Sequence, residues 1–540
     1  MSSPGKSTFS TWAPLRSPLF RALWLAALVS NFAIWMQNVS AAWLMTSLSH
    51  SATLVALVQT ATSLPFLLAA LPAGVIGDIV NRRWILVATL GWMTAVVLVL
   101  GLATMLGAMT PWLLLALTFA LGTGFAAMLP TWQAIQPDLV SRSALPQAIT
   151  LAGVNINVSR AVGPAVGGLL IAATGPAAVF LVNAVLFFVS LCVVFRWEGS
   201  RYHVTEPERF GGALRAGLRF ARNQPALRSV LVRAALFMVG GSAVLALLPL
   251  VARQQLGLGS DGYGLLLGCF GLGAVIGATL LSRLSQRESR NRIVAGASVV
   301  LALATFALAF AADPILAGLA LLVGGAAWLS AMANLNTTAQ TVLPAWVRAR
   351  ALSLYVLTFQ GCIAAGSAVW GIAADGLSVK IALMLAAVWL VASLGAFRRW
   401  PLVDGVGPAL TPSPHWPEPA VTDEPDAEEG PVLVTLEYRI DPENSREFDR
   451  AIQKLGRIRR RDGASRWGVF RDVADPGRHL ETFLVESWSE HMRQHARFTE
   501  ADRATEDAVR ALHLGEGPPV VSHLIADRPP ESLEKGVSPV

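Results

Sequence analysis

The chain has 540 residues, of which 54% are hydrophobic and only 14% are charged, whereas soluble globular proteins carry about 25% charged residues. The charges are divided unevenly: residues 1–400 hold 25 Lys+Arg and 9 Asp+Glu, while residues 401–540 hold 17 and 26. The first part therefore predicts a membrane-embedded block and the second a water-soluble tail. This division excludes an ordinary soluble enzyme, a disordered chain and a secreted domain held by disulfides.

The composition indicates no cofactor, metal or nucleic-acid site. The basic pI near 9.8 comes from the membrane block, where cations normally lie in cytoplasmic loops, so it does not indicate nucleic acid. No cysteine belongs to a C-x-x-C pair, and all three lie in apolar segments as packing residues: Cys192, Cys269 and Cys362. Lys6, Arg16 and Arg21 precede a long apolar stretch, which predicts a signal anchor.

Twelve apolar stretches of the first 400 residues reach the roughly 20 residues that a helix needs to cross a bilayer. They cover residues 20–46, 52–76, 84–107, 111–136, 147–173, 176–197, 229–252, 262–284, 292–312, 314–338, 351–374 and 378–400. The loop 198–228 separates two six-helix halves, residues 1–197 and 229–400. We therefore expect an all-α polytopic membrane protein with twelve transmembrane helices.

The two halves repeat each other. Residues 163–168 (GPAVGG) in the fifth span are echoed by residues 366–371 (GSAVWG) in the eleventh. A repeat of about 200 residues is typical of secondary transporters, whose substrate site lies between the halves near the bilayer midplane.

Positive charge is concentrated in every second loop. With the N-terminus inside, the inner segments hold 21 Lys+Arg and the outer loops hold only Arg253 and Lys380. The positive-inside rule then places both termini of this multi-pass protein in the cytoplasm and the spans in the cytoplasmic (inner) membrane. The two remaining cations, Arg160 and Arg233, fall within spans.

The central loop 198–228 carries arginines and apolar residues at helical spacing. Two interpretations stay open: a basic amphipathic helix on the inner membrane surface or a solvated linker. The membrane block as a whole is basic and the tail on the same side is acidic, so the two could attract each other. The residues concerned are Arg201, Arg209, Arg215, Arg219 and Arg222, with Leu214, Leu218 and Phe220.

The loop after the second span predicts a conformational latch. It contains Gly74, Asp78, Arg82 and Arg83. An acid at the inner end of a helix can meet cations and a helix N-terminus in one conformation and lose them in another. The alternative is that the arginines are only inner-surface anchors.

Small residues in the fifth and eighth spans predict a close helix contact. The fifth span carries a motif of small residues, Gly163, Pro164, Gly167 and Gly168, and the eighth carries Gly264, Gly268, Gly273 and Gly277. Small residues let helices approach closely in lipid, so the two spans would seal the outer side. The alternative is that these are ordinary glycines of membrane helices, with no part in a contact between the two spans.

Polar residues within spans are costly and often functional. An arginine at the membrane centre costs about 2.5–3.5 kcal/mol on insertion scales. Arg160 should therefore face a cavity, an anionic substrate or a partner. The alternative is that its side chain snorkels toward the inner surface or donates hydrogen bonds to neighbouring carbonyl groups. The candidate substrate-cavity residues are Asn31, Trp35, Asn38, Asn155, Arg160, Asn334 and Gln360.

The energy source is expected to be an ion gradient. The chain has no Walker A sequence, which argues against ATP-driven transport by this chain alone. No acidic residue lies deep in a span, since Asp78 and Asp138 fall at inner helix ends and Asp313 and Asp375 in outer turns.

The motif at residues 74–83 resembles the signature loop of the major facilitator superfamily, and residues 163–168 resemble the antiporter motif of its exporters. Ile79 and Asn81 depart from the usual loop residues. Residues 35–38 (WMQN), 43–46 (WLMT), 131–140 (TWQAIQPDLV) and 145–148 (LPQA) are similar to the enterobactin-exporter-like branch, the transmembrane secretion effectors.

This resemblance implies a major facilitator fold. It also implies export of a small molecule, such as a siderophore, a natural product or a drug, by alternating access with H+ as the coupling ion. Proton antiporters of the superfamily commonly place a carboxylate in the first or fourth span, and this chain does not.

The tail begins with a Pro-rich, acidic linker at 401–430. Alternating apolar residues predict a strand at 431–440, and strands at 464–472, 478–488 and 519–526 with helices at 443–461 and 489–512 complete a β-α-β-β-α-β domain at 431–527. Residues 528–540 are expected to be a disordered tail. The order is similar to the ferredoxin-like antibiotic-biosynthesis-monooxygenase fold, which usually pairs into a dimer.

The tail is predicted to be a regulatory, docking or dimerising module. Trp467, Trp488, His491, His495 and His523 are its candidate pocket residues, and a solvated helix face is the alternative for His491 and His495. Two competing hypotheses remain beside the exporter: a membrane-anchored monooxygenase-like enzyme and a membrane sensor that signals through the tail. Twelve spans with a repeat exceed what anchoring requires.

Overall fold

The computed structural model describes residues 12–79, 81–141, 143–199, 210–285, 287–344, 346–403 and 423–526, with residues 411, 413, 416, 419 and 421. The chain divides into two compact units. The membrane unit comprises residues 1–207, 231–337 and 355–402. The tail unit comprises residues 208–230, 338–354 and 403–540.

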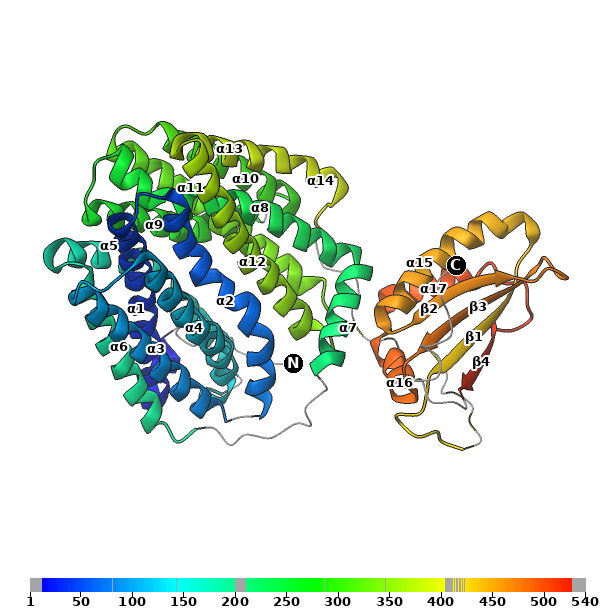
Figure 1. Cartoon of the computed structure of the whole chain (residues 1–540). Helices are drawn as coiled ribbons and strands as arrows, with labels where there is room; N and C mark the ends of the chain where they lie inside the picture. Colours follow the sequence, from blue (N-terminus) through cyan, green and yellow to red (C-terminus); the bar gives the residue numbers. More distant parts are fainter. Residues whose placement is uncertain are drawn as a thin grey trace, which may run out of the picture. The chain divides into compact units, whose positions relative to one another are not determined.

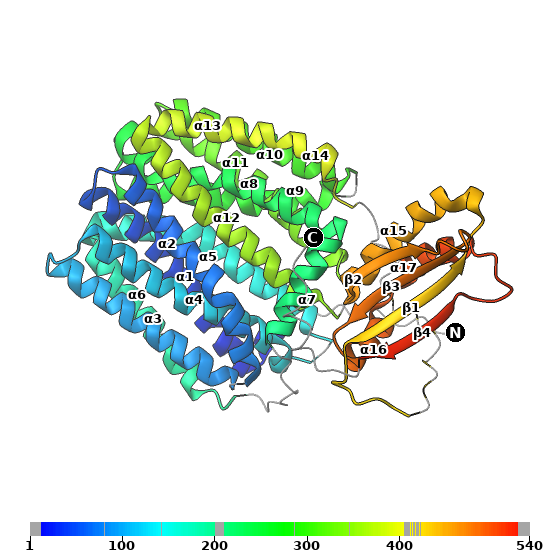
Figure 2. The same ribbon diagram turned by 45° about the vertical axis from the view of Figure 1, so that its right-hand side comes forward.

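The first half of the bundle contains six long helices, which follow a short 3-10 turn. They are α1 (Pro18–Leu48), α2 (Ala52–Ile79), α3 (Arg82–Met105), α4 (Pro111–Leu139), α5 (Leu145–Thr174) and α6 (Pro176–Arg196). The second half contains α8 (Pro225–Leu250), α9 (Ser260–Leu284), α10 (Arg290–Phe310), α11 (Pro314–Thr341), α12 (Arg348–Gly376) and α13 (Val379–Ala392), which is followed by α14 (Ala396–Arg399). The halves form neighbouring bundles (Figures 1 and 2).

These helices confirm the predicted polytopic architecture. In the described residues, eleven helices are long and apolar enough to cross a membrane, and the described part of α2 adds a shorter apolar helix, Ala52–Leu68. Each of the twelve predicted spans thus corresponds to one helix, α1–α6 or α8–α13. The central loop contains a further helix, α7 (Phe210–Asn223), so of its two interpretations the helical one fits the structure.

Turn chemistry sets the helix boundaries. The Thr110 side chain accepts a hydrogen bond from the Leu113 amide at 3.2 Å and Pro111 begins α4, because proline has no amide to lose at a first helical position. Gly175 ends α5 with a φ of +83°, which glycine adopts without strain, and Pro176 begins α6.

The loops differ between the two ends of the bundle. One end of the bundle, which we call the short-loop end, contains the loops at residues 49–51, 106–110, 175, 256–259, 311–313 and 377–378. The opposite end, where Arg82, Arg196, Arg290 and Arg348 lie at helix ends, is the arginine end.

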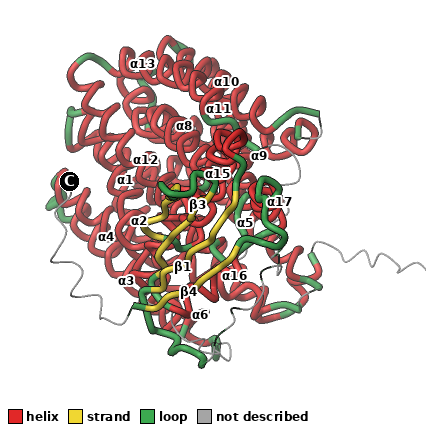
Figure 3. The backbone as a smooth tube through the Cα atoms, turned by 90° about the vertical axis from the view of Figure 1, so that its right-hand side faces the viewer, coloured by secondary structure: helices red, strands yellow, loops and turns green. Residues whose placement is uncertain are grey.

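The tail unit contains a four-stranded antiparallel sheet in the order β2-β3-β1-β4 (Figure 1). Figure 3 shows β3, β1 and β4 side by side. Its elements are β1 (Val432–Arg439), α15 (Ser445–Asp462), β2 (Ser465–Arg471), β3 (Arg478–Val485), α16 (Trp488–Arg497), α17 (Glu500–Arg510) and β4 (Val520–Ile525). The central strands β1 and β3 pair from Val432↔Val485 to Arg439↔Arg478. This is the split β-α-β arrangement expected from the strand and helix order.

One predicted tail helix is two helices. The stretch predicted as a single helix at 489–512 breaks after Arg497, because Thr499 and Asp502 form a capping box that begins α17. The Thr499 amide donates to Asp502 at 3.0 Å. The sequence signal was present, since Thr-x-x-Asp is a helix-start pattern.

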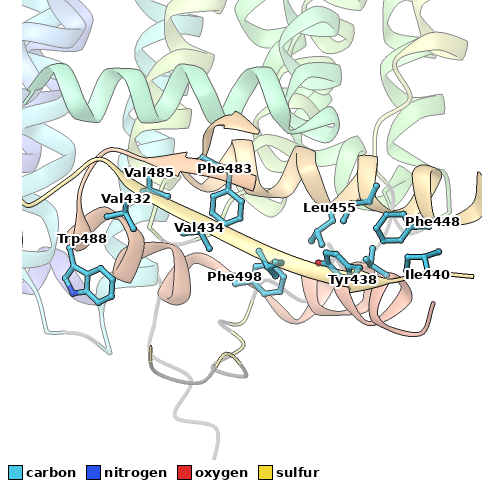
Figure 4. Packing of buried hydrophobic residues seen from close by; sticks show 14 residues of the cluster. Val432, Val434, Tyr438, Ile440, Phe448, Leu455, Phe483, Val485, Trp488 and Phe498 are labelled. Carbon is cyan, nitrogen blue, oxygen red and sulfur yellow. The ribbon is translucent and has the colours of Figure 1, made fainter. Parts of the chain in front are cut away.

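The tail core lies between one face of the sheet and the helices. Every second residue of β1 is buried, as the alternation predicted, and packs with Phe448 and Leu455 of α15 (Figure 4). Trp416, from the predicted linker, also packs on this domain: its indole nitrogen donates to Glu506 at 2.7 Å and its ring lies 4.6 Å from that of Phe498. Other linker residues also bond to this domain: the Ser413 amide donates to the Phe498 carbonyl at 2.8 Å, and the Thr411 carbonyl accepts from the Glu500 amide at 3.1 Å. Residues 404–410 and 527–540 lie outside the described residues.

Candidate functional site

A crevice of about 420 Å³ lies in the first half between α1, α4 and α5. Its lining is mainly apolar, with polar groups from Asn31, Gln133, Gln136 and Asn155. The Asn31 amide donates to Asn155 at 2.9 Å, and Asn155 donates to the Trp24 carbonyl at 3.1 Å. Two of the predicted cavity residues, one from each of two helices, therefore meet at this crevice.

Trp35 and Arg160 lie just beyond the crevice. Trp35 follows Asn31 by one turn of α1, and Arg160 follows Ile156, a lining residue, by one turn of α5. The Arg160 guanidinium carbon is 5.4 Å from the centre of the Trp35 ring, within cation–π range.

The other predicted cavity residues are not brought to the described lining of the crevice. Asn38 and Gln360 are half-buried in α1 and α12. Asn334 is buried, and its amide donates to the Ser330 carbonyl of its own helix at 2.9 Å.

The small-residue motif of α5 lies between two helices. A Cβ on Gly163 would lie 2.8 Å from the Trp35 Cβ, and one on Gly167 would lie 3.1 Å from the Met36 Cα, both on α1. A Cβ on Gly168 would lie 2.9 Å from the Gly264 Cα on α9. One motif thus holds α5 against α1 in its own half and against α9 in the other half.

The glycines of α9 divide between two neighbours. Gly264, Gly268 and Gly271 face α5, whereas a Cβ on Gly277 would lie 2.7 Å from the Ala326 Cα on α11. The grouping of Gly273 and Gly277 with the α5 contact was wrong. Nine residues, the separation of Gly264 and Gly273, make about two and a half turns and place the two on opposite faces.

The sequence repeat has the same geometry in the second half. A Cβ on Gly366 of α12 would lie 3.0 Å from the Val239 Cα on α8, within the same half. A Cβ on Gly371 would lie 3.1 Å from the Thr53 Cα on α2, in the other half. Each half therefore contributes one helix that touches both halves through glycine.

Two charged side chains join the halves at the short-loop end. Asp375, at the end of α12, accepts hydrogen bonds from the Ser51 hydroxyl at 2.6 Å and from the Thr53 amide at 3.0 Å, at the start of α2. Arg253 donates to the hydroxyls of Thr46 and Ser47 at 2.9 Å, at the end of α1. The acid thus meets a helix N-terminus and the cation a helix C-terminus, as helix dipoles favour.

Sequence reasoning placed Arg253 and Asp375 only in outer loops and missed this role. The signal was their position, since a charge in loops otherwise nearly free of charge needs a partner. Nothing in the sequence pairs residues 375 and 51, which are far apart along the chain.

The bonds described at the arginine end stay within one half. Arg82 of α3 donates to Asp138 of α4 at 3.0 Å and to the Ala134 carbonyl at 3.0 Å. Arg83 donates to the Phe195 carbonyl of α6. The predicted partners Gly74 and Asp78 lie outside the residues whose side chains are described.

Beside its apolar core, the tail domain contains buried ion pairs and indole rings. Buried Arg459 lies 3.5 Å from Glu481 and 3.4 Å from Glu506. The Trp467 indole donates to Glu481 at 2.8 Å, so this candidate pocket residue is part of the network. Burial, with the Glu481 carboxylate beside it, raises the pKa of Tyr438 well above its usual value.

The histidines of the tail cluster through their rings. The His491 ring lies 5.0 Å from His495, 4.8 Å from His523 and 5.6 Å from Trp488. Burial, together with His523 and His495, lowers the pKa of His491 to about 3, so its ring is neutral near pH 7. The described residues contain no group of three or more His, Cys, Asp or Glu arranged to hold a metal ion.

Within the tail unit, α7 contacts the folded domain. Arg219 of α7 donates to Glu490 of α16 at 3.2 Å, and Arg497 donates to the same carboxylate at 2.6 Å. Arg497 also lies 4.6 Å from the ring of Trp346, in the loop between α11 and α12. The acidic domain and the basic central loop therefore form an ion pair within the tail unit.

In the described residues, eleven long apolar helices and the shorter described part of α2 form two halves, with a crevice in the first half and glycine contacts between the halves, as in a major facilitator fold. Solved structures agree. The bundle is similar to a mutant form of the nucleoside transporter NupG, at 11% identity over 71% of this chain and 100% of that one, with a TM-score of 0.60. It is also similar to a bacterial homologue of the human lysosomal transporter Spinster, at 15% identity over 72% and 97%, with a TM-score of 0.59.

The chain belongs to the transmembrane secretion effector family, whose model matches residues 9–530. It is a multi-pass membrane protein of that family, as the sequence resemblance implied. The match to the family extends through the tail, whereas these two solved structures cover 71% and 72% of this chain.

Curated relatives are exporters and transporters of small molecules. The enterobactin exporter EntS of Salmonella typhi is 27% identical over 61% of this chain and 78% of its own length. The staphyloferrin A transporter of Staphylococcus aureus is 23% identical over 46% and 63%, and the multidrug efflux pump Tap of Mycobacterium bovis is 27% identical over 40% and 53%. The chain thus spans about three fifths of the staphyloferrin A transporter and half of Tap.

Proposed function

We propose that the protein is a secondary active transporter that exports a small molecule, siderophore-like, natural product or drug, across the cytoplasmic membrane by alternating access. Its family and the names of its relatives support this proposal. The observation that carries it is the pair of glycine junctions, α5 on α9 and α12 on α2, because both lie between halves that must separate for a pathway to open at that end.

We assign the arginine end to the cytoplasm and both termini to the same side. The distribution of 21 Lys+Arg against 2 in alternate loops supports this orientation. The crevice then opens toward the cytoplasm, and the short-loop end, where the halves are joined, is the outer gate. Cargo enters the crevice from the cytoplasm and leaves after the outer contacts break.

The proposed gating residues belong to the two ends. Pro164 and Gly168 close the outer side against α9, and Gly163 and Gly167 hold α5 on α1. The loop with Asp78, Arg82 and Arg83 closes the inner side after the change of conformation. The coupling ion of the proposal is the proton. Its carrier would be a carboxylate at a helix end, since none of the nine acidic residues of the membrane block lies in mid-span.

The tail is proposed to be an accessory module that pairs with a second copy. The sheet face opposite the core exposes large apolar side chains, with Phe470 61% exposed, Val520 67% and Leu524 54%, beside the ion pair of Arg478 with Glu437. The buried ion pairs that occupy its interior do not favour the monooxygenase alternative. The contact of α7 with Glu490 supports a docking role.

Transport in everted membrane vesicles tests the proposal. Vesicles that contain the full chain should accumulate ethidium or a purified catecholate siderophore when a proton gradient is imposed, and a protonophore should abolish the accumulation. A chain without residues 401–540 should retain it. Absence of accumulation across a panel of siderophores and dyes, with the protein present in the membrane, would contradict export.

A further inference from the structure

The membrane block has two arginines within its spans, and in the described part of the chain side-chain hydrogen bonds are seen for Arg233, although its second terminal nitrogen has no partner there. Arg233 of α8 donates to the Asn291 side chain at 2.8 Å and to the Trp400 carbonyl at 3.4 Å, and it lies over the Phe397 ring. These partners lie near the arginine end: Asn291 is in the first turn of α10, and Trp400 follows α14. Arg233 is therefore accounted for as a structural residue.

Arg160 differs in depth and in partners. It is the sixteenth of the 30 residues of α5, so it lies near the middle of the span. Its Nε atom is buried with no hydrogen-bond partner among the described residues, and its described contact is the Trp35 ring. The nine acidic residues of the first 400 all lie at helix ends or in loops, so the sequence offers no carboxylate at this depth.

Arg160 lies between the crevice of the first half and the junction of the two halves. Its backbone lies at the junction of the halves, since a Cβ on Gly271 of α9 would lie 2.7 Å from the Arg160 carbonyl oxygen. Its side chain lies one turn beyond the crevice lined by Asn31 and Ile156. A molecule that entered the crevice from the arginine end would meet Trp35 and Arg160 at its inner limit.

We propose that Arg160 is the anion-binding residue of the transport site and that the cargo carries a carboxylate or a similar oxyanion beside a planar ring. This inference rests on the exporter function proposed above. A guanidinium binds a carboxylate through two parallel hydrogen bonds, and removal from water strengthens the pair. The Trp35 face orients the guanidinium and offers a surface on which a ring can stack.

A comparison of probes with different charge tests the inference. In everted vesicles, Arg160→Gln should lower gradient-driven accumulation of anionic carboxyfluorescein by at least about tenfold, the loss expected for one charge-assisted hydrogen bond. Accumulation of cationic ethidium should not fall, and Arg160→Lys should retain part of the anion transport. The matched control is Arg233→Gln, which changes protein level and stability but should leave the ratio of the two probes unchanged.

Binding to the purified full chain separates this inference from the exporter proposal. Phthalate, a planar dicarboxylate, should raise the melting temperature of the wild type and of Arg160→Lys but not of Arg160→Gln, and benzamide should raise none. If phthalate stabilises the wild type in this pattern and no probe is transported, the anion site stands and export fails. If Arg160→Gln keeps both the wild-type probe ratio and the phthalate shift, the inference is overturned.

Discussion

The two ends of the membrane unit are held together in different ways. At the short-loop end, Asp375 and Arg253 of the second half bond to residues of the first, and two glycine junctions lie beside them. At the arginine end, the bonds described for Arg82 and Arg83 join helices of the first half to one another. The described contacts between the halves thus hold the short-loop end closed, and they must break for the halves to rock apart there.

The largest expected effect comes from the glycine junction. Gly168→Leu would place side-chain atoms where the Gly264 Cα already leaves only 2.9 Å for a Cβ. The two helices must separate, because overpacking of this kind costs about 1–3 kcal/mol or more. We expect gradient-driven transport in vesicles to fall by more than about tenfold.

The matched control is Gly91→Leu on α3, since nothing lies within 4 Å of a Cβ at that position. This variant should keep wild-type transport. Equal transport in both variants would mean that the close approach of α5 and α9 has no part in the cycle.

Asp375→Asn is expected to loosen the same end without steric change. The amide keeps one acceptor but loses the charge that faces the N-terminus of α2 and its hydroxyl and amide donors. Because the carboxylate is exposed, we expect the closed state to lose about 1–2 kcal/mol, which is about a tenfold shift in population. Spin labels at exposed Leu106 and Leu377, one in each half, should report a larger share of long distances.

Asp313→Asn is the control for this measurement. Asp313 lies at the same end, but it accepts from the Leu316 amide of its own helix at 3.2 Å. The distance distribution should stay that of the wild type. An equal change in both variants would assign the effect to net charge rather than to the bond between halves.

A smaller effect is expected for Arg253→Gln. The variant removes the charge over the Trp43 ring at 5.6 Å, while glutamine still reaches one of the hydroxyls of Thr46 and Ser47. We expect a shift of about threefold in the same spin-label experiment, as for the loss of one exposed cation–π contact of roughly 0.5–1 kcal/mol. Lys380→Gln is the control, because Lys380 lies over Phe310 within its own half.

The fold was predictable because its signals are local. Apolar length, proline and glycine at helix ends, and alternation in β1 each act over one element, so twelve helices and the strand order followed from the sequence. The break before Thr499 was missed because the helix pattern of apolar residues continues across it, although the capping residues were visible.

The candidate site was predictable only in part. Asn31, Trp35, Asn155 and Arg160 were selected because polar residues in spans are costly, and the structure brings them to one region of α1 and α5. That Gln133 lines the same crevice, and that Asp375 reaches Ser51, depends on how distant helices pack. A single sequence does not show which helices, far apart along the chain, pack side by side.

The smallest effect should come from the arginine end, and it sharpens the comparison most directly. Asp138→Asn weakens a half-exposed ion pair with Arg82 that lies within one half, and such pairs contribute about 0–1 kcal/mol. We expect the spin-label distances at Leu106 and Leu377 to be unchanged and transport to stay within about twofold of the wild type. Asp78→Asn, in the proposed latch, should slow transport more. If Asp138→Asn instead opened the short-loop end as much as Asp375→Asn, the two ends would be coupled through the first half, and the distinction between bonds across the halves and bonds within one half would be lost.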